Sequence, residues 1–559
     1  MKRILALITL AATTLAAQQS NQQPAAEIPK LSESIDVKVI NVDVVVTDRK
    51  GNPITGLTKD DFELFENGQP KLLSNFYEVQ GKKATNISII PAGEEKPVAT
   101  VPAEEITENL RRRIIFYVDN LSLQPFNRNR VFKDMKEFAK NVMRPGDEAM
   151  VATFNRSMKI RVNFTRDPVQ VQQTLDTIAG ESALGVSNKS EKRDVEKRIQ
   201  DADNYNEAVS AARQYGQSVE HDLRTSVESL KALMTTLAGV EGKKILVLTT
   251  EGFQIQPGRE MFYLVDEISR EKGWPAGGTM LEGMTFNSAS TIQMLAQTAN
   301  ANGITLYTLH AGGLGAANEG NLAERDRPIP FAVVQAGVSN STESLQVLAE
   351  MTGGLASINT NNFAGAFKNI LRDLDSYYSL GYRAGTERVD RQRAIDVRVK
   401  GKRGYLVRSR QSFVEKSTYA EMSDRVIANL LYRSKANDLN VRVKINTPVP
   451  ADDLFRVPVE IQIPMESLTL LPQGESHLGG FTIYVAVANK DGDMSDVAQK
   501  QQQIRVPSAD MAKLKGKYYT YVLDLLMERG VNRVSIGVVD DVSNVTGFDR
   551  QQVIAQDLR

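Results

Sequence analysis

Oxygen-bearing side chains carry most of the chemistry that this sequence could perform. Asp119 ends the short apolar run of residues 113–118, and Glu251 comes shortly after a second apolar run at residues 243–249. Such carboxylates are oxygen donors that suit hard cations. They can equally cap a following helix or accept hydrogen bonds from loop amides. Both interpretations of Asp119 stay open here, and Glu251 could simply close its loop.

The residue types used in most other active sites are scarce or scattered. The 559 residues include no Cys, which excludes disulfides, thiol nucleophiles and Cys-ligated metal centres. The three histidines are distant in sequence, at positions 221, 310 and 477. No G-x-S-x-G elbow occurs, and the run GGLG at 312–315 lacks both dinucleotide spacing and a P-loop lysine. Because no complete catalytic set is present, we expect no enzymatic activity.

A second group of oxygen donors lies near the C-terminus. Residues 489–496 (NKDGDMSD) carry oxygen-bearing side chains at alternate positions, as calcium loops do. The segment lacks the length and the distal Glu of an EF-hand. Asp-Gly is also a common hairpin turn, and we interpret the segment in that way.

Composition and charge indicate an ordinary globular protein of several domains. At roughly 150 residues per domain, this length predicts three to four domains. The chain is 41% apolar and 24% charged, and its 68 basic residues balance 68 acidic residues. Nucleic-acid-binding proteins usually carry a basic surplus, so we expect no nucleic-acid partner.

The first 17 residues have the pattern of a secretory signal peptide. Met1 to Arg3 is basic, residues 4–12 are apolar, and small residues follow up to Ala17. We expect cleavage after Ala16 or Ala17 and an exported protein, either periplasmic or extracellular. An uncleaved anchor is the alternative. No later stretch reaches the ~20 apolar residues of a membrane helix, so we expect no integral membrane segment after cleavage.

The central part of the chain alternates between strand and helix patterns, which predicts a doubly wound parallel sheet with helices on both faces over residues 113–382. The expected strands are 113–119, 148–154, 243–249, 304–309 and 355–359, with 158–164 at an edge. Charged or Gly/Pro-rich insertions interrupt the pattern near 187–224, 253–287 and 312–340. We expect the first to form a solvated helix or helical hairpin. All three should leave the carboxyl ends of the strands, where open α/β sheets bind ligands.

The flanking regions have the patterns of β structure. We expect a linker at 18–34, a small β-sandwich-like region at 35–80, a second linker at 81–112, a β extension at 383–416, a helical connector at 417–439 and a C-terminal β-sandwich at 440–559. The predicted fold is therefore multidomain α/β plus β, with two β-sandwiches flanking the doubly wound domain.

Four motifs in order resemble one bacterial family. They are VVVTDRKGNPITGLTKDDFELFENGQ, IIFYVDNLSLQ, LVLTTEGF and YYSLGY. Together they resemble the secreted von Willebrand factor A-related proteins known mostly from acidobacteria. The resemblance covers roughly residues 35–412 and implies a von Willebrand A-like fold for the central domain.

The resemblance also implies a divalent-metal site at the top of the sheet. The family holds its ion with a D-x-S-x-S loop, a Thr from a second loop and an Asp from a third. The first loop here reads Asp119-Asn120-Leu121-Ser122-Leu123, so leucines replace both serines and Ser122 is out of phase. Thr225 is in a plausible place for the second loop, and Glu251 replaces the third-loop Asp. The implied ligands of a degenerate Mg or Mn site are therefore Asp119, Ser122, Thr225 and Glu251.

These observations favour a non-enzymatic exported binding or adhesion protein. The top of the sheet and its inserted loops would bind a protein or a cell-surface polymer, with or without the degenerate metal site. The alternative is an exported structural or assembly component in which a metal-free A domain is only a scaffold. An exported hydrolase is the least favoured class.

Overall fold

The computed structural model describes residues 39–81, 86–91, 99–102, 111–275, 278–314, 327–383, 389–401, 404–433 and 436–556. The predicted signal peptide and the linker at 18–34 lie outside the described residues. The chain divides into two compact units, one of residues 37–235 and 241–415, the other including residues 236–240 and 416–559.

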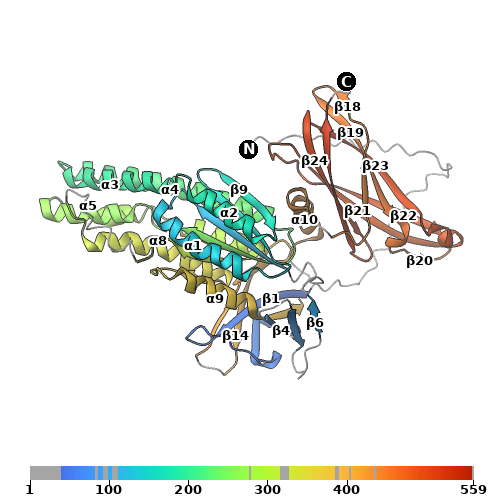
Figure 1. Cartoon of the computed structure of the whole chain (residues 1–559), viewed down its shortest axis with the longest axis horizontal. Helices are drawn as coiled ribbons and strands as arrows, with labels where there is room; N and C mark the ends of the chain where they lie inside the picture. The colour runs from blue at the N-terminus through green and yellow to red at the C-terminus, as the bar shows by residue number, and fades with distance from the viewer. Residues whose placement is uncertain are drawn as a thin grey trace. The chain divides into compact units, whose positions relative to one another are not determined.

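A six-stranded sheet forms the centre of the first unit, as predicted (Figure 1). Its order is β12-β11-β10-β7-β8-β9, and neighbours are parallel except that edge strand β9 runs antiparallel to β8. All eight residues of β7 are buried, as expected for a parallel strand covered on both faces. The strands are β7 (Arg112–Asp119), β8 (Glu148–Phe154), β9 (Met158–Thr165), β10 (Lys243–Thr250), β11 (Ile304–His310) and β12 (Ala356–Ser357).

Helices cover both faces of this sheet. One core joins β7 to α1, α2 and α9, with Phe116, Phe138 and Phe367 among its buried rings. On β11, Leu309 belongs to that core, whereas the Thr308 hydroxyl donates to the Leu345 carbonyl of α8. Because side chains alternate along a strand, α8 lies on the opposite face. The helices are α1 (Pro125–Val142), α2 (Pro168–Ala179), α7 (Ala289–Ala301), α8 (Phe331–Thr352) and α9 (Phe363–Asp375).

The insertions contain helices that extend beyond the sheet. In Figure 1, α3, α5 and α8 project together, and α3 and α8 each contact α5. The helices are α3 (Gly185–Asp201), α4 (Tyr205–Thr236), α5 (Arg259–Lys272) and α6 (Thr279–Gly283). The solvated hairpin expected at 187–224 is thus two helices whose apolar faces share a buried core with α5, including Ala212, Tyr215 and Phe262. Alanines supply much of that core, so it is less visible in sequence than a stripe of large apolar residues.

Antiparallel sheets built from both ends of the first unit's sequence complete that unit. One has the order β15-β1-β13-β4-β5-β6 and the other β16-β14-β2-β3, and inward side chains of both share one core. The strands are β1 (Val39–Thr47), β2 (Phe62–Glu66), β3 (Gln69–Lys71), β4 (Leu73–Gly81), β5 (Asn86–Pro91), β6 (Ala99–Pro102), β13 (Ser376–Arg383), β14 (Gln392–Val399), β15 (Leu406–Ser409) and β16 (Ser412–Val414).

Two expected boundaries differ from this arrangement. Residues 376–382, assigned to the α/β domain, form β13, which pairs with β1 and β4 rather than with the parallel sheet. Strands β5 and β6 lie within the segment expected to be a linker. Strand pairing between distant segments is not encoded in local periodicity, so sequence spacing could not assign either segment to its sheet.

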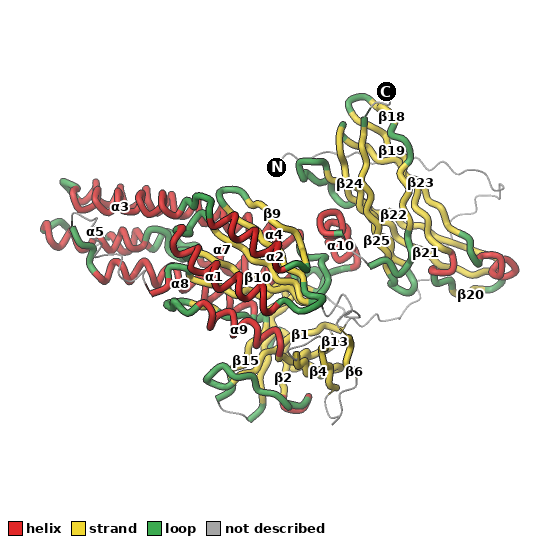
Figure 2. Tube along the Cα trace, in the orientation of Figure 1, coloured by secondary structure: helices red, strands yellow, loops and turns green. Residues whose placement is uncertain are grey.

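The second unit consists of antiparallel strands and one long helix (Figure 2). Its two sheets share a core that includes Val459, Ile461 and Ile536, and α10 packs on strands β21, β24 and β25. The elements are α10 (Thr418–Tyr432), β17 (Arg442–Ile445), β18 (Val449–Ala451), β19 (Leu454–Pro464), β20 (Leu471–Gln473), β21 (Ser476–Ala488), β22 (Ala498–Pro507), β23 (Tyr518–Met527), β24 (Gly530–Asp540) and β25 (Thr546–Ala555).

The described helices were also compared with the requirements of a membrane span. None of them combines the length and the apolar character needed to cross a bilayer.

Candidate functional site

The strand order places two chemistry-bearing loops side by side. The order reverses direction between β7 and β10, and open α/β sheets bind ligands beyond the carboxyl ends of the strands at such a point. Val118 and Thr249 are register partners in this parallel pair. The next residues, Asp119 and Thr250, therefore emerge together at the carboxyl edge.

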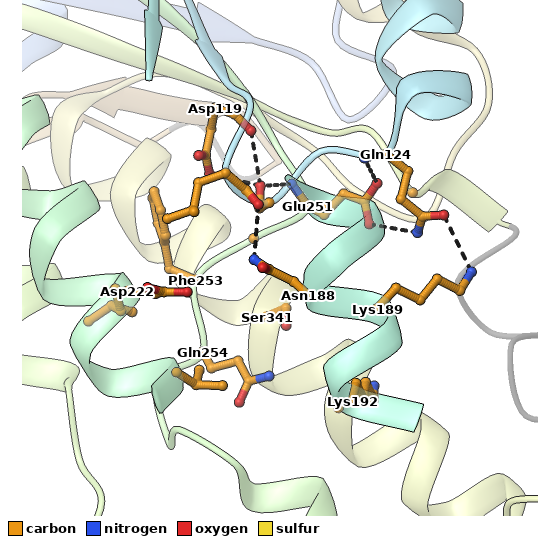
Figure 3. A pocket seen from close by; sticks show the side chains of 18 of the residues that line it. Asp119, Gln124, Asn188, Lys189, Lys192, Asp222, Glu251, Phe253, Gln254 and Ser341 are labelled. Atoms are coloured by element: carbon orange, nitrogen blue, oxygen red, sulfur yellow. Dashed lines mark hydrogen bonds between the residues drawn. The ribbon is translucent and has the colours of Figure 1, made fainter. Parts of the chain in front are cut away.

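A compact hydrogen-bond cluster links these loops. Figure 3 shows its Asp119 and Glu251. Asp119 Oδ2 accepts from the Ser122 hydroxyl at 2.8 Å and from the Thr250 hydroxyl at 2.7 Å. The two hydroxyl oxygens are 2.9 Å apart, and the Glu251 amide donates to Ser122 Oγ at 3.0 Å. The cluster ties the end of β7 to the end of β10.

Asp119 is the buried carboxylate of this cluster. Its residue is 1% exposed, and its Oδ1 has no hydrogen-bond partner among the described residues. Burial raises the pKa of the Asp119 carboxyl, while the bonds from Thr250 and Ser122 oppose that rise. The charge of this carboxylate is therefore only partly compensated by the protein.

Glu251 points its carboxylate at a different set of donors. Its Oε1 accepts from the Gln124 amide at 2.9 Å and from Asn127 Nδ2 at 2.9 Å, next to the first turn of α1. The Gln124 side chain contributes a longer contact of 3.4 Å to Oε2. A carboxylate close to a helix N-terminus is favourably placed relative to the helix dipole. Glu251 thus fastens the β10 loop to α1.

The loop after β7 is covered by the first inserted helix. A Cβ at Gly185 would lie 2.3 Å from the Leu123 carbonyl oxygen and 2.4 Å from that of Ser122, so only glycine permits this approach. Asn188 Nδ2 donates to the Leu121 carbonyl at 3.0 Å. Leu121 and Leu123 are 4% and 0% exposed. The two leucines of the degenerate motif therefore pack into the protein interior.

A buried guanidinium supports the same loop from the other side. Arg128 of α1 is fully buried, and its Nη1 donates to Asn120 Oδ1 at 3.1 Å. Its Nη2 donates to the carbonyls of Ala179 and Glu181, each at 2.9 Å. Because desolvation disfavours the cation, burial lowers the pKa of Arg128. The loop that carries Asp119 is thus held rigidly in place.

A cavity of about 450 Å³ opens beside this cluster. Its walls come from the loops after β7 and β10, from α3, α4 and α8, and from the start of α5. Figure 3 shows Asp119 and Glu251 at one end of the cavity and Gln254 and Lys192 at the other. A volume of this size is in the range of small-molecule sites. All three predicted insertions therefore contribute to one cavity at the expected edge of the sheet.

The structure brings together three of the four expected ligands. Asp119, Ser122 and Glu251 line the cavity. Thr225 lies within α4 instead, and its hydroxyl donates to the His221 carbonyl of the preceding turn at 3.0 Å. Its neighbour Ser226 lines the cavity in its place. The sequence could not show which face of this long helix is turned inward.

The donor set fits a divalent ion poorly. Mg²⁺ prefers an octahedron of oxygen ligands in which one or two carboxylates leave room for water. Asp119 Oδ2 is already bonded to two hydroxyls, and the Glu251 carboxylate is bonded to Gln124 and Asn127. In the part of the chain that the structure describes, no group of three or more His, Cys, Asp or Glu could hold a metal ion. Asp119 Oδ1 is the one oxygen of these two carboxylates that has no hydrogen-bond partner among the described residues.

The calcium-loop candidate has the contacts of a turn. Asn489 Oδ1 accepts from the amides of Asp491 and Asp493, each at 3.0 Å. Gly492 has a positive φ of 89°, which a tight turn requires. These bonds agree with our interpretation of the segment as a turn.

Several residues of the site could not be, or were not, predicted from the sequence. Thr250 could have been found from the expected strand ends, because parallel strands place the residues that follow them next to each other. Arg128, Asn188 and Glu260 gave no comparable signal, since each is a polar residue on a helix whose orientation depends on tertiary packing. His310, which sequence spacing set aside, is the last residue of β11 and lines the cavity.

Comparisons with known proteins give distant structural likenesses. No family model matches the chain, and no curated protein matches it. An aerotolerance-related membrane protein from Bacteroides fragilis is 11% identical, with 47% of this chain and 98% of that chain covered and a TM-score of 0.23. A von Willebrand factor type A protein from Catenulispora acidiphila is 9% identical, covering 87% and 74%, with a TM-score of 0.23. Proximal thread matrix protein 1 of the mussel byssus, with a zinc-occupied MIDAS motif, is 12% identical, covering 48% of each chain, with a TM-score of 0.22.

Proposed function

We propose that this chain is an exported, non-enzymatic binding protein whose von Willebrand A-like domain takes its ligand into the cavity at the carboxyl edge of the parallel sheet. The ligand belongs to a protein or a surface polymer, and its binding requires no divalent ion. The cavity carries this proposal, because it lies at the strand-order reversal and is walled by every insertion.

The hydrogen bonding of the loops beside the cavity supports a binding role. Asp119, Arg128 and Glu251 each fix a loop through several hydrogen bonds. A preformed site loses little conformational entropy when its ligand arrives. Loops that are held in this way are suited to recognition rather than to large rearrangement.

The bonding of the Asp119 cluster supports metal-independent binding. An ion at this place would compete with the Ser122 and Thr250 hydroxyls for the carboxylate. Oε1 of the other nearby carboxylate, Glu251, is already bonded to the Gln124 amide and to Asn127. The same internal bonding favours the alternative function, in which the domain is a scaffold within an assembly and binds nothing in the cavity.

Blocking the cavity tests the proposal and separates the two functions. Ser218 on α4 lines the cavity, whereas its neighbour Gln217 is exposed and does not. Ligand-observed NMR with a library of small polar fragments should find binders to the wild type in the presence of EDTA. Those signals should disappear in Ser218→Trp and persist in Gln217→Trp.

Two results would count against the binding role. Fragments that bind Ser218→Trp and the wild type equally would place recognition elsewhere. A wild type that binds no fragment would support the scaffold function. Circular dichroism of both variants shows whether the helix and the fold are kept.

A further inference from the structure

A buried glutamate lines the cavity and takes no part in the hydrogen bonds of the Asp119 cluster. Glu260 is in the first turn of α5 and is 1% exposed. The next residues, Met261 and Phe262, belong to the core that α3, α4 and α5 share. Gly337 of α8 faces the Glu260 side chain, with its Cβ position 3.5 Å from three of the glutamate carbons. Glu260 is therefore held between α5, which packs on α3 and α4, and α8.

The two carboxylate oxygens of Glu260 have different surroundings. Oε1 accepts from Gln254 Nε2 at 3.1 Å, and Lys192 Nζ lies 3.6 Å from it. The second distance is an ion-pair contact that is too long for a hydrogen bond. Oε2 is buried and has no hydrogen-bond partner among the described residues. An unpaired oxygen of a buried carboxylate costs free energy, which a donor from a ligand would recover.

The electrostatics of the cavity favour a cationic donor. Five carboxylates line the cavity against three basic side chains: Asp119, Glu191, Asp222, Glu251 and Glu260 against Arg130, Lys189 and Lys192. Tyr215, in the same wall, has a pKa raised well above its usual value by burial and then by Glu260, Glu196 and Glu191. The three carboxylates therefore lie close enough to Tyr215 to disfavour its phenolate form.

Two simpler reasons for burying Glu260 at this position are the dipole of α5 and a divalent ion, and neither provides a donor to Oε2. The amino end of α5 favours a negative charge in its first turn, but Glu260 Oε2 receives no amide hydrogen from it. A divalent ion would need several oxygen ligands, and in the described segments no group of three or more Asp, Glu, His or Cys residues is arranged to hold a metal ion. An N–H cation needs only one well-placed carboxylate and its neighbours.

We propose that Glu260 and Gln254 form a subsite for an alkylguanidinium or alkylammonium group, the chemistry of an arginine or lysine side chain. The cation donates to Glu260 Oε2, and the aliphatic stem runs along the cavity toward its mouth. This subsite deepens the proposed function, because it identifies a basic side chain as the part of the partner that enters the cavity. It does not depend on any group bound at Asp119.

Calorimetric titration with butylguanidinium tests the subsite directly. Wild-type protein should bind it saturably, and butylurea, its uncharged analogue, should not bind. Glu260→Gln keeps the side-chain shape but removes the charge, and should weaken binding at least tenfold. Glu271→Gln, at an exposed position of the same helix, should bind like the wild type. Lys192→Gln should bind more tightly, because a competing cation beside Glu260 is removed.

The outcomes separate this proposal from the proposed function. Equal binding of butylguanidinium and butylurea, or equal binding by wild type and Glu260→Gln, would overturn the subsite. If other fragments still depended on Ser218, the cavity would remain the binding site. Absence of all binding would remove both proposals. An end-blocked arginine dipeptide that binds as well as butylguanidinium would identify a partner's side chain as the source, whereas binding of butylguanidinium alone would identify a small free cation.

Discussion

At the scale of single residues, the chemistry of the site depends on which donors hydrogen-bond to each carboxylate. Asp119 takes both of its bonds on one oxygen, whereas Glu251 takes amide donors from the start of α1. The sequence identified Asp119, Ser122 and Glu251 through the resemblance to the von Willebrand A ion-binding loops. It could not show that Glu251 bonds to α1, since this depends on a side-chain orientation that no spacing encodes. The Asp119 carboxylate accepts hydrogen bonds from the loops, and too few free oxygens lie around it to bind a cation.

The buried Asp119 predicts a specific pH dependence of stability. Burial raises its pKa in the folded protein above the ordinary value of 3.8. The ionised form is therefore disfavoured by folding, and its cost is absent below about pH 3.8 and grows as the pH rises toward the folded-state pKa. Asp119→Asn removes this cost, so its free energy of unfolding relative to the wild type should increase between pH 4 and pH 7. Urea unfolding of both proteins at the two pH values measures the difference. A difference that shrinks with increasing pH would show that Asp119 is stabilised as the anion.

At the scale of elements, the insertions are what turn a sheet edge into a cavity. The alternation of strand and helix patterns predicted the parallel sheet, because apolar runs such as residues 113–118 are unmistakable in sequence. Helix α5 and the first half of α8 were missed within segments interpreted as Gly/Pro-rich excursions, whereas the second half of α8 was predicted as a helix at 342–351. Gly258 directly precedes α5 and Pro330 directly precedes α8, and Gly337 lies inside α8. Local composition therefore obscured α5 and the start of α8.

The contact between α3 and the Asp119 loop can be tested by one methyl group. Gly185→Ala places a Cβ within 2.3 Å of the Leu123 carbonyl oxygen, so the helix must move away from the loop. We expect a loss of about 1–3 kcal/mol in unfolding free energy, the usual cost of overpacking, together with weaker fragment binding. Gly180→Ala is the matched control, because its nearest contact is an ordinary 3.6 Å. If thermal unfolding shows equal stability for both variants, α3 does not press on this loop as described.

At the scale of the whole molecule, the two units have separate hydrophobic cores. The core of the second unit contains Ile461 and Ile536 and draws on strands β19 to β25, whereas the parallel sheet has its own core around Phe116. The sequence predicted β structure after residue 440 but could not assign residues 376–414 to the same sheets as residues 39–81. Those pairings join strands more than 300 residues apart, as Val44 with Tyr378 shows.

Separate cores predict separate unfolding transitions. Ile461→Ala removes a fully buried side chain from the second unit and should cost about 2–5 kcal/mol there. Val247→Ala makes the corresponding change in the parallel sheet. Differential scanning calorimetry of the full chain should show two transitions, with each variant lowering one of them. A single transition that both variants lower equally would show that the units unfold together.

The central claim is that binding at the carboxyl-edge cavity does not pass through a divalent ion held by Asp119. Calorimetric titration of Mg²⁺ and Mn²⁺ into the EDTA-treated, dialysed protein, beside Asp119→Ala, tests it most directly. The account predicts no saturable heat in either protein, because the Asp119 carboxylate is bonded to the Ser122 and Thr250 hydroxyls and Glu251 is bonded to the start of α1. Saturable binding of one ion by the wild type that is lost in Asp119→Ala would contradict the account and establish a metal site at the top of the sheet.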